Sequence, residues 1–150
     1  MPMRMGTPLP SLAGASEWVN GEVNNDELTG ENVLVHFWST SCGSCHEIMP
    51  KIKEWKETYG PRGLRFVGIH MPRSEKDTDV DAVKADIDES GLTWPQAIDN
   101  QHSIKEAFGN QYVPAFYVFN EQGVLRHFQA GDRGVKMLEG AIERVLKPKE

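Results

Sequence analysis

The chain has 150 residues, of which 39% are apolar and 25% charged, a balance typical of one globular domain spanning residues 1–150. Its formal net charge of −6 argues against nucleic acid as a routine partner, because binding a phosphate backbone requires a basic face. The apolar runs are too short to span a membrane, and two cysteines are too few for a structural disulfide framework.

An extended lead-in opens the chain. Residues 1–15 are rich in proline, glycine and alanine, which favours irregular backbone. The pair Asn20-Gly21 then stands between apolar flanks and predicts a β-hairpin across residues 17–23. A single helical turn is predicted at residues 25–28, where Gly30 stops it.

Two buried strands and the helix between them form the predicted centre of the fold. Residues 33–38 and 64–70 are short, continuous apolar runs, which are typical of strands buried on both faces. Between them, apolar residues recur at helical spacing from Cys45 to Tyr59 and predict one amphipathic helix. Pro50 lies inside this helix and is expected to kink it.

The rest of the chain continues the alternation of strands and helices. Helices are predicted at residues 80–90, 103–108 and 135–146, and strands at residues 94–98, 115–119 and 124–128. The turn between the last two strands makes them an antiparallel hairpin. This order predicts an α/β fold, in which helices flank both faces of a central sheet, and the closing hairpin makes that sheet mixed.

The string Thr-Ser-Cys-Gly-Ser-Cys-His at residues 40–46 carries the candidate chemistry. Cys42 and Cys45, followed directly by His46, fit a c-type haem attachment, half of a zinc site or a redox dithiol. Haem is disfavoured because cytochromes of this kind are mostly helical, whereas this pair follows a strand. Zinc is disfavoured because a closed site needs four ligands, and the other histidines are scattered. We therefore expect no metal and no cofactor.

The redox dithiol has a physical argument of its own. A cysteine at the first turn of a helix meets unpaired backbone N–H groups, and the positive end of the helix dipole stabilises its thiolate. Cys42 is therefore expected to be exposed and nucleophilic. Cys45 is expected one turn deeper, on the same side of the helix, where it can attack a mixed disulfide formed by Cys42.

Three stretches carry a resemblance to a known family. Residues 33–45, Pro50 and residues 113–119 are similar to those of thioredoxin-fold oxidoreductases of the ResA/TlpA class. The similarity extends over nearly the whole chain. It implies a thioredoxin fold with a central mixed sheet, an N-terminal β-hairpin extension and a central αβ insertion between residues 64 and 108.

The resemblance also assigns roles to residues. It implies Cys42 as the attacking thiol and Cys45 as the resolving thiol. It further implies a cis peptide bond between Val113 and Pro114 that faces the pair, so that Val113 pairs with a partner chain like an added strand. Trp38, Ser41 and Gly43 complete the expected partner groove.

Two familiar acids of the family are missing. His36 stands where thioredoxins place a buried acid, six residues before the first cysteine, and Ile48 stands where ResA-type proteins often have Glu. We therefore expect His36 to act either as a proton relay for Cys45 or as a packing residue, because histidine titrates near neutral pH.

Two further departures concern the loop around the pair. Ser41 stands where many relatives have Trp, so a more open groove is expected. Ser44 replaces the proline that is common between the cysteines of thioredoxins. The absence of this proline predicts a midpoint potential at or above about −270 mV, the value of thioredoxin itself.

The expected partners are protein disulfides or dithiols, together with a reductant system whose identity the sequence does not give. The N-terminus lacks an apolar run of signal-peptide length, so we expect the protein in the cytoplasm. In that compartment we expect it to act as a reductase, and we expect it to be a monomer. The alternative is an extracytoplasmic protein whose anchor has been removed. Two other functions stay open, a thioredoxin-fold module that binds partners without turnover and a peroxiredoxin-like peroxidase, although Ser39 stands where a peroxidase has Thr.

Overall fold

The computed structural model describes residues 3–147, so the first two residues of the predicted lead-in lie outside the described part. The elements follow the predicted order. The strands are β1 (Glu17–Val19), β2 (Asn32–Trp38), β3 (Leu64–His70), β4 (Gln96–Ile98), β5 (Ala115–Phe119) and β6 (Leu125–Ala130). The helices are α1 (Gly43–Tyr59), α2 (Val80–Ser90), α3 (Ser103–Phe108) and α4 (Val135–Leu146), with single 3-10 turns η1 (Asn25–Leu28), η2 (Gly60–Arg62) and η3 (Glu75–Thr78).

The six strands form one mixed sheet in the order β1-β4-β3-β2-β5-β6. The central strand β2 pairs in parallel with β3 and antiparallel with β5, and β3 pairs in parallel with β4. Parallel neighbours require crossover connections, which α1 and α2 supply. The thioredoxin-like fold, with its central αβ insertion, is confirmed.

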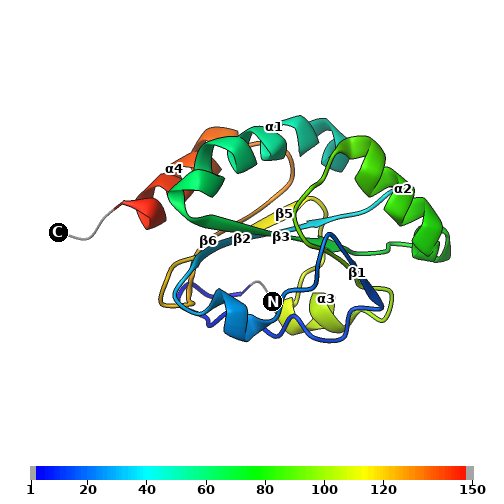
Figure 1. Ribbon diagram of the computed structural model, residues 1–150, viewed down its shortest axis with the longest axis horizontal. Helices are drawn as coiled ribbons and strands as arrows, with labels where there is room; N and C mark the ends of the chain where they lie inside the picture. The colour runs from blue at the N-terminus through cyan, green and yellow to red at the C-terminus, as the bar shows by residue number, and fades with distance from the viewer. Residues whose placement is uncertain (1–2, 148–150) are drawn as a thin grey trace.

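Helices cover both faces of the sheet (Figure 1). Helices α1, α2 and α4 lie on one face, and α3 lies with the N-terminal segment on the other. The side chains of β2 alternate between two buried clusters, because successive residues of a strand point to opposite faces. Leu34 and Trp38 pack against the α1 layer, whereas Val35 and Phe37 pack against the α3 layer.

The predicted N-terminal hairpin is wrong in its pairing. Asn20 and Gly21 do make a turn with positive φ angles of 65° and 102°, but β1 pairs antiparallel with β4 instead of with the residues after the turn. The side-chain amide of Asn20 donates to the carbonyls of Leu92 and Trp94 at 2.6 and 3.2 Å. These bonds fasten the turn to the segment that leads into β4, so β1 becomes an edge strand of the main sheet.

Helix α1 carries the candidate site at its N-terminus. It continues through Pro50 to Tyr59, and the missing N–H of Pro50 leaves the carbonyl of His46 without its usual donor four residues on. Among residues 3–147, no helix has both the length and the apolar character that a bilayer crossing needs.

Candidate active site

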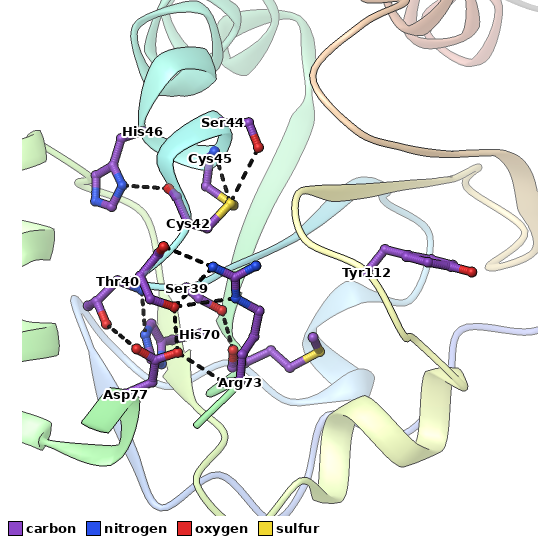
Figure 2. Close-up of a disulfide and its surroundings, with 12 residues drawn as sticks. Ser39, Thr40, Cys42, Ser44, Cys45, His46, His70, Arg73, Asp77 and Tyr112 are labelled. Atoms are coloured by element: carbon purple, nitrogen blue, oxygen red, sulfur yellow. Dashed lines mark hydrogen bonds between the residues drawn. A yellow bond between two sulfur atoms is a disulfide. The ribbon is translucent and has the colours of Figure 1, made fainter. Parts of the chain in front are cut away.

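Cys42 and Cys45 are bonded to each other across the first turn of α1 (Figure 2), with their Cα atoms 5.3 Å apart. Cys42 is the N-cap residue of the helix, and its Sγ accepts the backbone N–H of Cys45 at 3.1 Å. The hydroxyl of Ser44 lies 3.6 Å from the same sulfur. In the reduced protein these donors and the helix dipole favour a thiolate on Cys42.

The expected exposure of Cys42 is not found in the disulfide state. Cys42 is 3% exposed and Cys45 is 1% exposed. The difference from the sequence-based expectation arises because the side chain of an N-cap residue folds back over the first helical turn. Ser41 and Gly43, on either side of Cys42, are exposed and leave the backbone open to an approaching chain.

The Val113–Pro114 peptide bond is cis, as predicted. Val113 packs against the apolar cluster that contains both cysteines, and Pro114 is buried. Tyr112, immediately before it, is 60% exposed and stands apart from the disulfide in Figure 2. The accessible part of the predicted groove therefore consists of Ser41, Gly43 and Val113.

Trp38 lies beneath the site, and not on the surface of the groove. Its ring is 1% exposed, and its indole N–H donates to the side-chain oxygen of Gln96 at 2.9 Å. The ring also meets His70 edge-on, with a centroid separation of 4.9 Å. In this structure Trp38 supports the strand that carries the site and cannot touch a partner.

His36 lies on β2, buried, with its ring in contact with Trp94 and Phe116. Its Nε2 accepts the indole N–H of Trp94 at 2.9 Å. Burial lowers the pKa of His36 to about 3, so the titration near neutral pH on which the relay hypothesis depends is not present. The relay role stays a prediction, and an unchanged pH–rate profile in His36→Asn would assign the residue to packing alone.

A polar network that the sequence did not reveal surrounds the loop before Cys42 (Figure 2). The buried carboxylate of Asp77 accepts the hydroxyls of Thr40 and Ser41 at 3.2 and 2.8 Å and the backbone N–H of Arg73 at 3.0 Å. Burial raises the pKa of Asp77, but these hydrogen bonds outweigh burial, and the pKa lies below its ordinary value. The guanidinium of Arg73 donates to the Ser41 carbonyl at 2.8 Å and so fixes the residue next to Cys42.

His70 supports the same loop from β3. Its Nε2 accepts the backbone N–H of Thr40 at 3.0 Å, and its Nδ1 is buried without a partner in the described chain. The hydroxyl of Ser39 donates to the carbonyl of Met71. Burial lowers the pKa of His70 to about 4, so its ring is neutral at pH 7.

Parallel pairing is the signal that could have revealed this network. Residues that follow two neighbouring parallel strands meet at the same edge of the sheet. Because β2 and β3 are parallel neighbours, residues 39–42 and residues 70–77 meet there. The sequence predicted both strands but not that they are adjacent.

The two buried neutral histidines predict a loss of stability in acid. In the unfolded chain each ring binds a proton below its ordinary pKa of 6.5. In the folded chain the pKa is about 4 for His70 and about 3 for His36, so the rings bind a proton only at lower pH. Stability is therefore fully present above pH 6.5 and is lost as the pH falls through this window. These two rings together should lower the free energy of unfolding by about 3–4 kcal/mol between pH 7 and pH 5. The raised pKa of His46 offsets part of this loss, because its stabilising contribution increases as the pH falls.

Urea unfolding followed by tryptophan fluorescence at the two pH values measures this loss. Changing His36 or His70 singly to Asn removes one of the two rings and should reduce the difference by about half. Equal unfolding free energies at pH 5 and pH 7 would contradict the assignment of neutral rings.

The chain is similar to known proteins over nearly its whole length. The sequence pattern of the Redoxin family matches residues 5–145. Thiol-disulfide oxidoreductase YkuV of Bacillus subtilis is 46% identical over 149 residues, which cover 99% of this chain and 100% of that protein. Thiol-disulfide oxidoreductase ResA of Bacillus anthracis is 24% identical over 143 residues, which cover 95% of this chain and 79% of that protein.

A solved structure agrees with the fold over almost the whole chain. The solution structure of a thioredoxin-like protein in the oxidized form superimposes with a TM-score of 0.87 at 47% sequence identity. The match covers 96% of this chain and 97% of the other.

Proposed function

This chain belongs to the Redoxin family and is a thiol–disulfide oxidoreductase, and on that premise we propose that it reduces disulfides in partner proteins. The observation that carries the proposal is the bonded Cys42–Cys45 pair at the N-terminus of α1, with Val113 packed against its cluster. A disulfide at this place can be opened and closed without unfolding the helix that holds it.

The first step of the proposed reaction is attack by Cys42. Its thiolate attacks one sulfur of the partner disulfide, a bond forms between Cys42 and that sulfur, and the partner's other sulfur leaves as a thiolate. The N–H of Cys45 and the positive end of α1 stabilise the attacking anion. The exposed residues Ser41 and Gly43 and the half-buried Val113 offer the partner chain a place to bind.

The second step is resolution by Cys45. The sulfur of Cys45 attacks Cys42 Sγ, so that the bond between the cysteines forms and the bond between Cys42 and the partner breaks. The partner's sulfur leaves as a thiolate and takes up the proton that the Cys45 thiol has lost. Two electrons have then passed from the cysteine pair to the partner. A dithiol donor of the cell restores the pair by the reverse exchange.

The proposed setting is the cytoplasm, with the protein working as a monomer. A reductase role suits this compartment, because its thiol pools keep cysteine pairs reduced. Thiol trapping in intact cells tests the setting. We expect most of the Cys42–Cys45 pair to be recovered as the dithiol, whereas recovery as the disulfide would favour an oxidising compartment.

Reduction of insulin by dithiothreitol tests the activity. The protein should accelerate insulin precipitation catalytically, at substoichiometric amounts. A protein that binds insulin without changing the rate would be a binding module, and one that consumes hydrogen peroxide instead would be a peroxidase. The bonded cysteine pair and the buried Ser39, whose hydroxyl is held by Met71, give no support to the peroxidase.

A further inference from the structure

His46, the residue that directly follows Cys45, has an oxygen acceptor at each ring nitrogen. Its Nδ1 lies 2.7 Å from the backbone carbonyl oxygen of Cys42 (Figure 2), and its Nε2 lies 2.7 Å from the Oδ2 atom of Asp86. A carbonyl and a carboxylate oxygen can only accept hydrogen bonds, so each nitrogen must donate. Only the imidazolium carries both N–H groups, and a neutral ring would place one nitrogen lone pair against an oxygen.

We propose that His46, held in its protonated form by Asp86, is a positioning residue that stabilises the thiolate of reduced Cys42. This inference rests on the proposed thiol–disulfide exchange and names the residues that tune it. His46 does not contact the reacting sulfur and does not give up its proton. It acts through the Cys42 carbonyl and through its charge at the N-terminus of α1.

The carboxylate of Asp86 is fixed in position beside the His46 ring. It lies on α2, and its second oxygen, Oδ1, accepts the hydroxyl of Ser90 one turn along the same helix at 3.0 Å. The side chain of Asp86 is 17% exposed and that of His46 is 35% exposed. A charge pair in such a partly buried position is screened less by solvent than one on the open surface.

The other groups around His46 leave Asp86 as its counter-ion. The ring of Trp38 on β2 meets His46 edge-on at 6.3 Å and is neutral. His70 on β3 lies against the same indole, and burial keeps it neutral at pH 7. Glu47, next along α1, is exposed, and within residues 3–147 Asp86 is the one carboxylate paired with His46.

The balance of these effects favours the imidazolium. Partial burial lowers the pKa of His46, but the hydrogen bonds to Asp86 and to the Cys42 carbonyl, together with the charge of Asp86, outweigh it and leave the pKa above its ordinary value. The two oxygen acceptors at the ring nitrogens and this raised pKa both favour the cationic ring. A cation near the start of a helix that bears a thiolate lowers the energy of the reduced state and has no comparable effect on the disulfide.

The carbonyl of Cys42 links the imidazolium to the helix start. This oxygen also accepts the backbone N–H of His46 at 3.3 Å, the first hydrogen bond of α1. The ring N–H therefore adds a second donor to the same acceptor and fixes the first turn, which contains the N–H that Sγ accepts. Loss of the charge should destabilise the thiolate even where the helix remains intact.

Alkylation of the reduced protein by iodoacetamide, measured as a function of pH, tests the proposal. His46→Gln keeps a hydrogen-bond donor without the charge and should reduce the thiolate fraction of Cys42 at pH 6 by about threefold to tenfold. The midpoint potential should fall as well, by at most about 15–30 mV, which is a threefold to tenfold change in the acid dissociation constant of Cys42 converted at about 30 mV per factor of ten. His46→Lys keeps the cation and should retain most of the wild-type thiolate fraction.

Variants of α2 provide the matched controls. Asp86→Asn should behave like the wild type at pH 5.5, where His46 is protonated in either case, and like His46→Gln at pH 7, where the proposal requires Asp86 to hold the charge. Asp88→Asn removes the same charge from an exposed position of the same helix and should change nothing at either pH. An equal effect of Asp88→Asn, or an alkylation profile of His46→Gln that superimposes on the wild type, would overturn the proposal.

Nitrogen NMR of the His46 ring gives an independent readout. Both ring nitrogens should show the shifts of protonated nitrogen at pH 7, and a single protonated nitrogen would refute the charge. Neither alkylation nor NMR needs a partner protein. If the alkylation and NMR results are as expected but insulin is not reduced, the proposed function is rejected and the His46–Asp86 assignment stands. If insulin is reduced but the alkylation and NMR results are not as expected, the assignment alone is rejected.

Discussion

Replacing Cys45 with serine is expected to trap a covalent complex between Cys42 and a partner protein. The variant retains the attacking sulfur at the N-cap of α1 and lacks the sulfur that would displace the partner. The mixed disulfide should therefore persist on a non-reducing gel and disappear with dithiothreitol. Turnover of insulin should fall by about a thousandfold or more, because covalent catalysis is lost when its nucleophile or resolving group is removed.

Cys42→Ser is the matched control. It removes the sulfur that accepts the Cys45 N–H and leaves the buried Cys45 alone. This variant should show the same loss of turnover but no trapped complex. If Cys42→Ser formed the adduct and Cys45→Ser did not, the roles of the two cysteines would be reversed.

Gly68→Ala is expected to destabilise the fold strongly. Gly68 lies in the middle of β3, opposite His36 of β2, and a Cβ atom there would lie 2.0 Å from the side-chain oxygen of Gln96. That oxygen accepts the indole N–H of Trp38, so moving Gln96 leaves a buried donor unpaired beneath the active site. Overpacking and the lost hydrogen bond together should cost about 2–5 kcal/mol of unfolding free energy.

Gly140→Ala separates this clash from a general effect of adding a methyl group. Gly140 lies within α4, and its Cβ would meet only the flexible end of Arg144 at 3.6 Å. Alanine should therefore raise the unfolding free energy slightly, by about 0.5–1 kcal/mol, through helix propensity. Urea unfolding of both variants measures the difference. An equal stability of Gly68→Ala and the wild type would show that the space beside Gln96 is not tight.

Much of the fold could be predicted from local patterns. Strand β2 and helix α1 follow from a continuous apolar run and a helical stripe, because burial of these patterns requires those conformations. The pairing of β1 could not be predicted in the same way. It depends on bonds between Asn20 and the carbonyls of Leu92 and Trp94, more than seventy residues away, which no local pattern contains.

The candidate site likewise contains residues that a local pattern predicts and residues that only the fold brings together. Cys42 and Cys45 were found because their spacing and their place after a strand are themselves the motif. Asp77 and Asp86 were not found, since each is one acid among many in a chain with 22 acidic residues. Only the packing of β3 and α2 around the start of α1 brings their carboxylates to Ser41 and His46.

A redox titration of the Cys42–Cys45 pair in glutathione buffers tests the central claim most directly. The fraction of disulfide can be followed by mass spectrometry, because an alkylating reagent adds mass only to free thiols. We expect a reversible two-electron transition with a midpoint at or above about −270 mV, the value of thioredoxin. A pair that stays oxidised below about −300 mV, as structural disulfides do, would contradict the account, because cellular thiols could not return such a bond to the dithiol that attacks partner proteins.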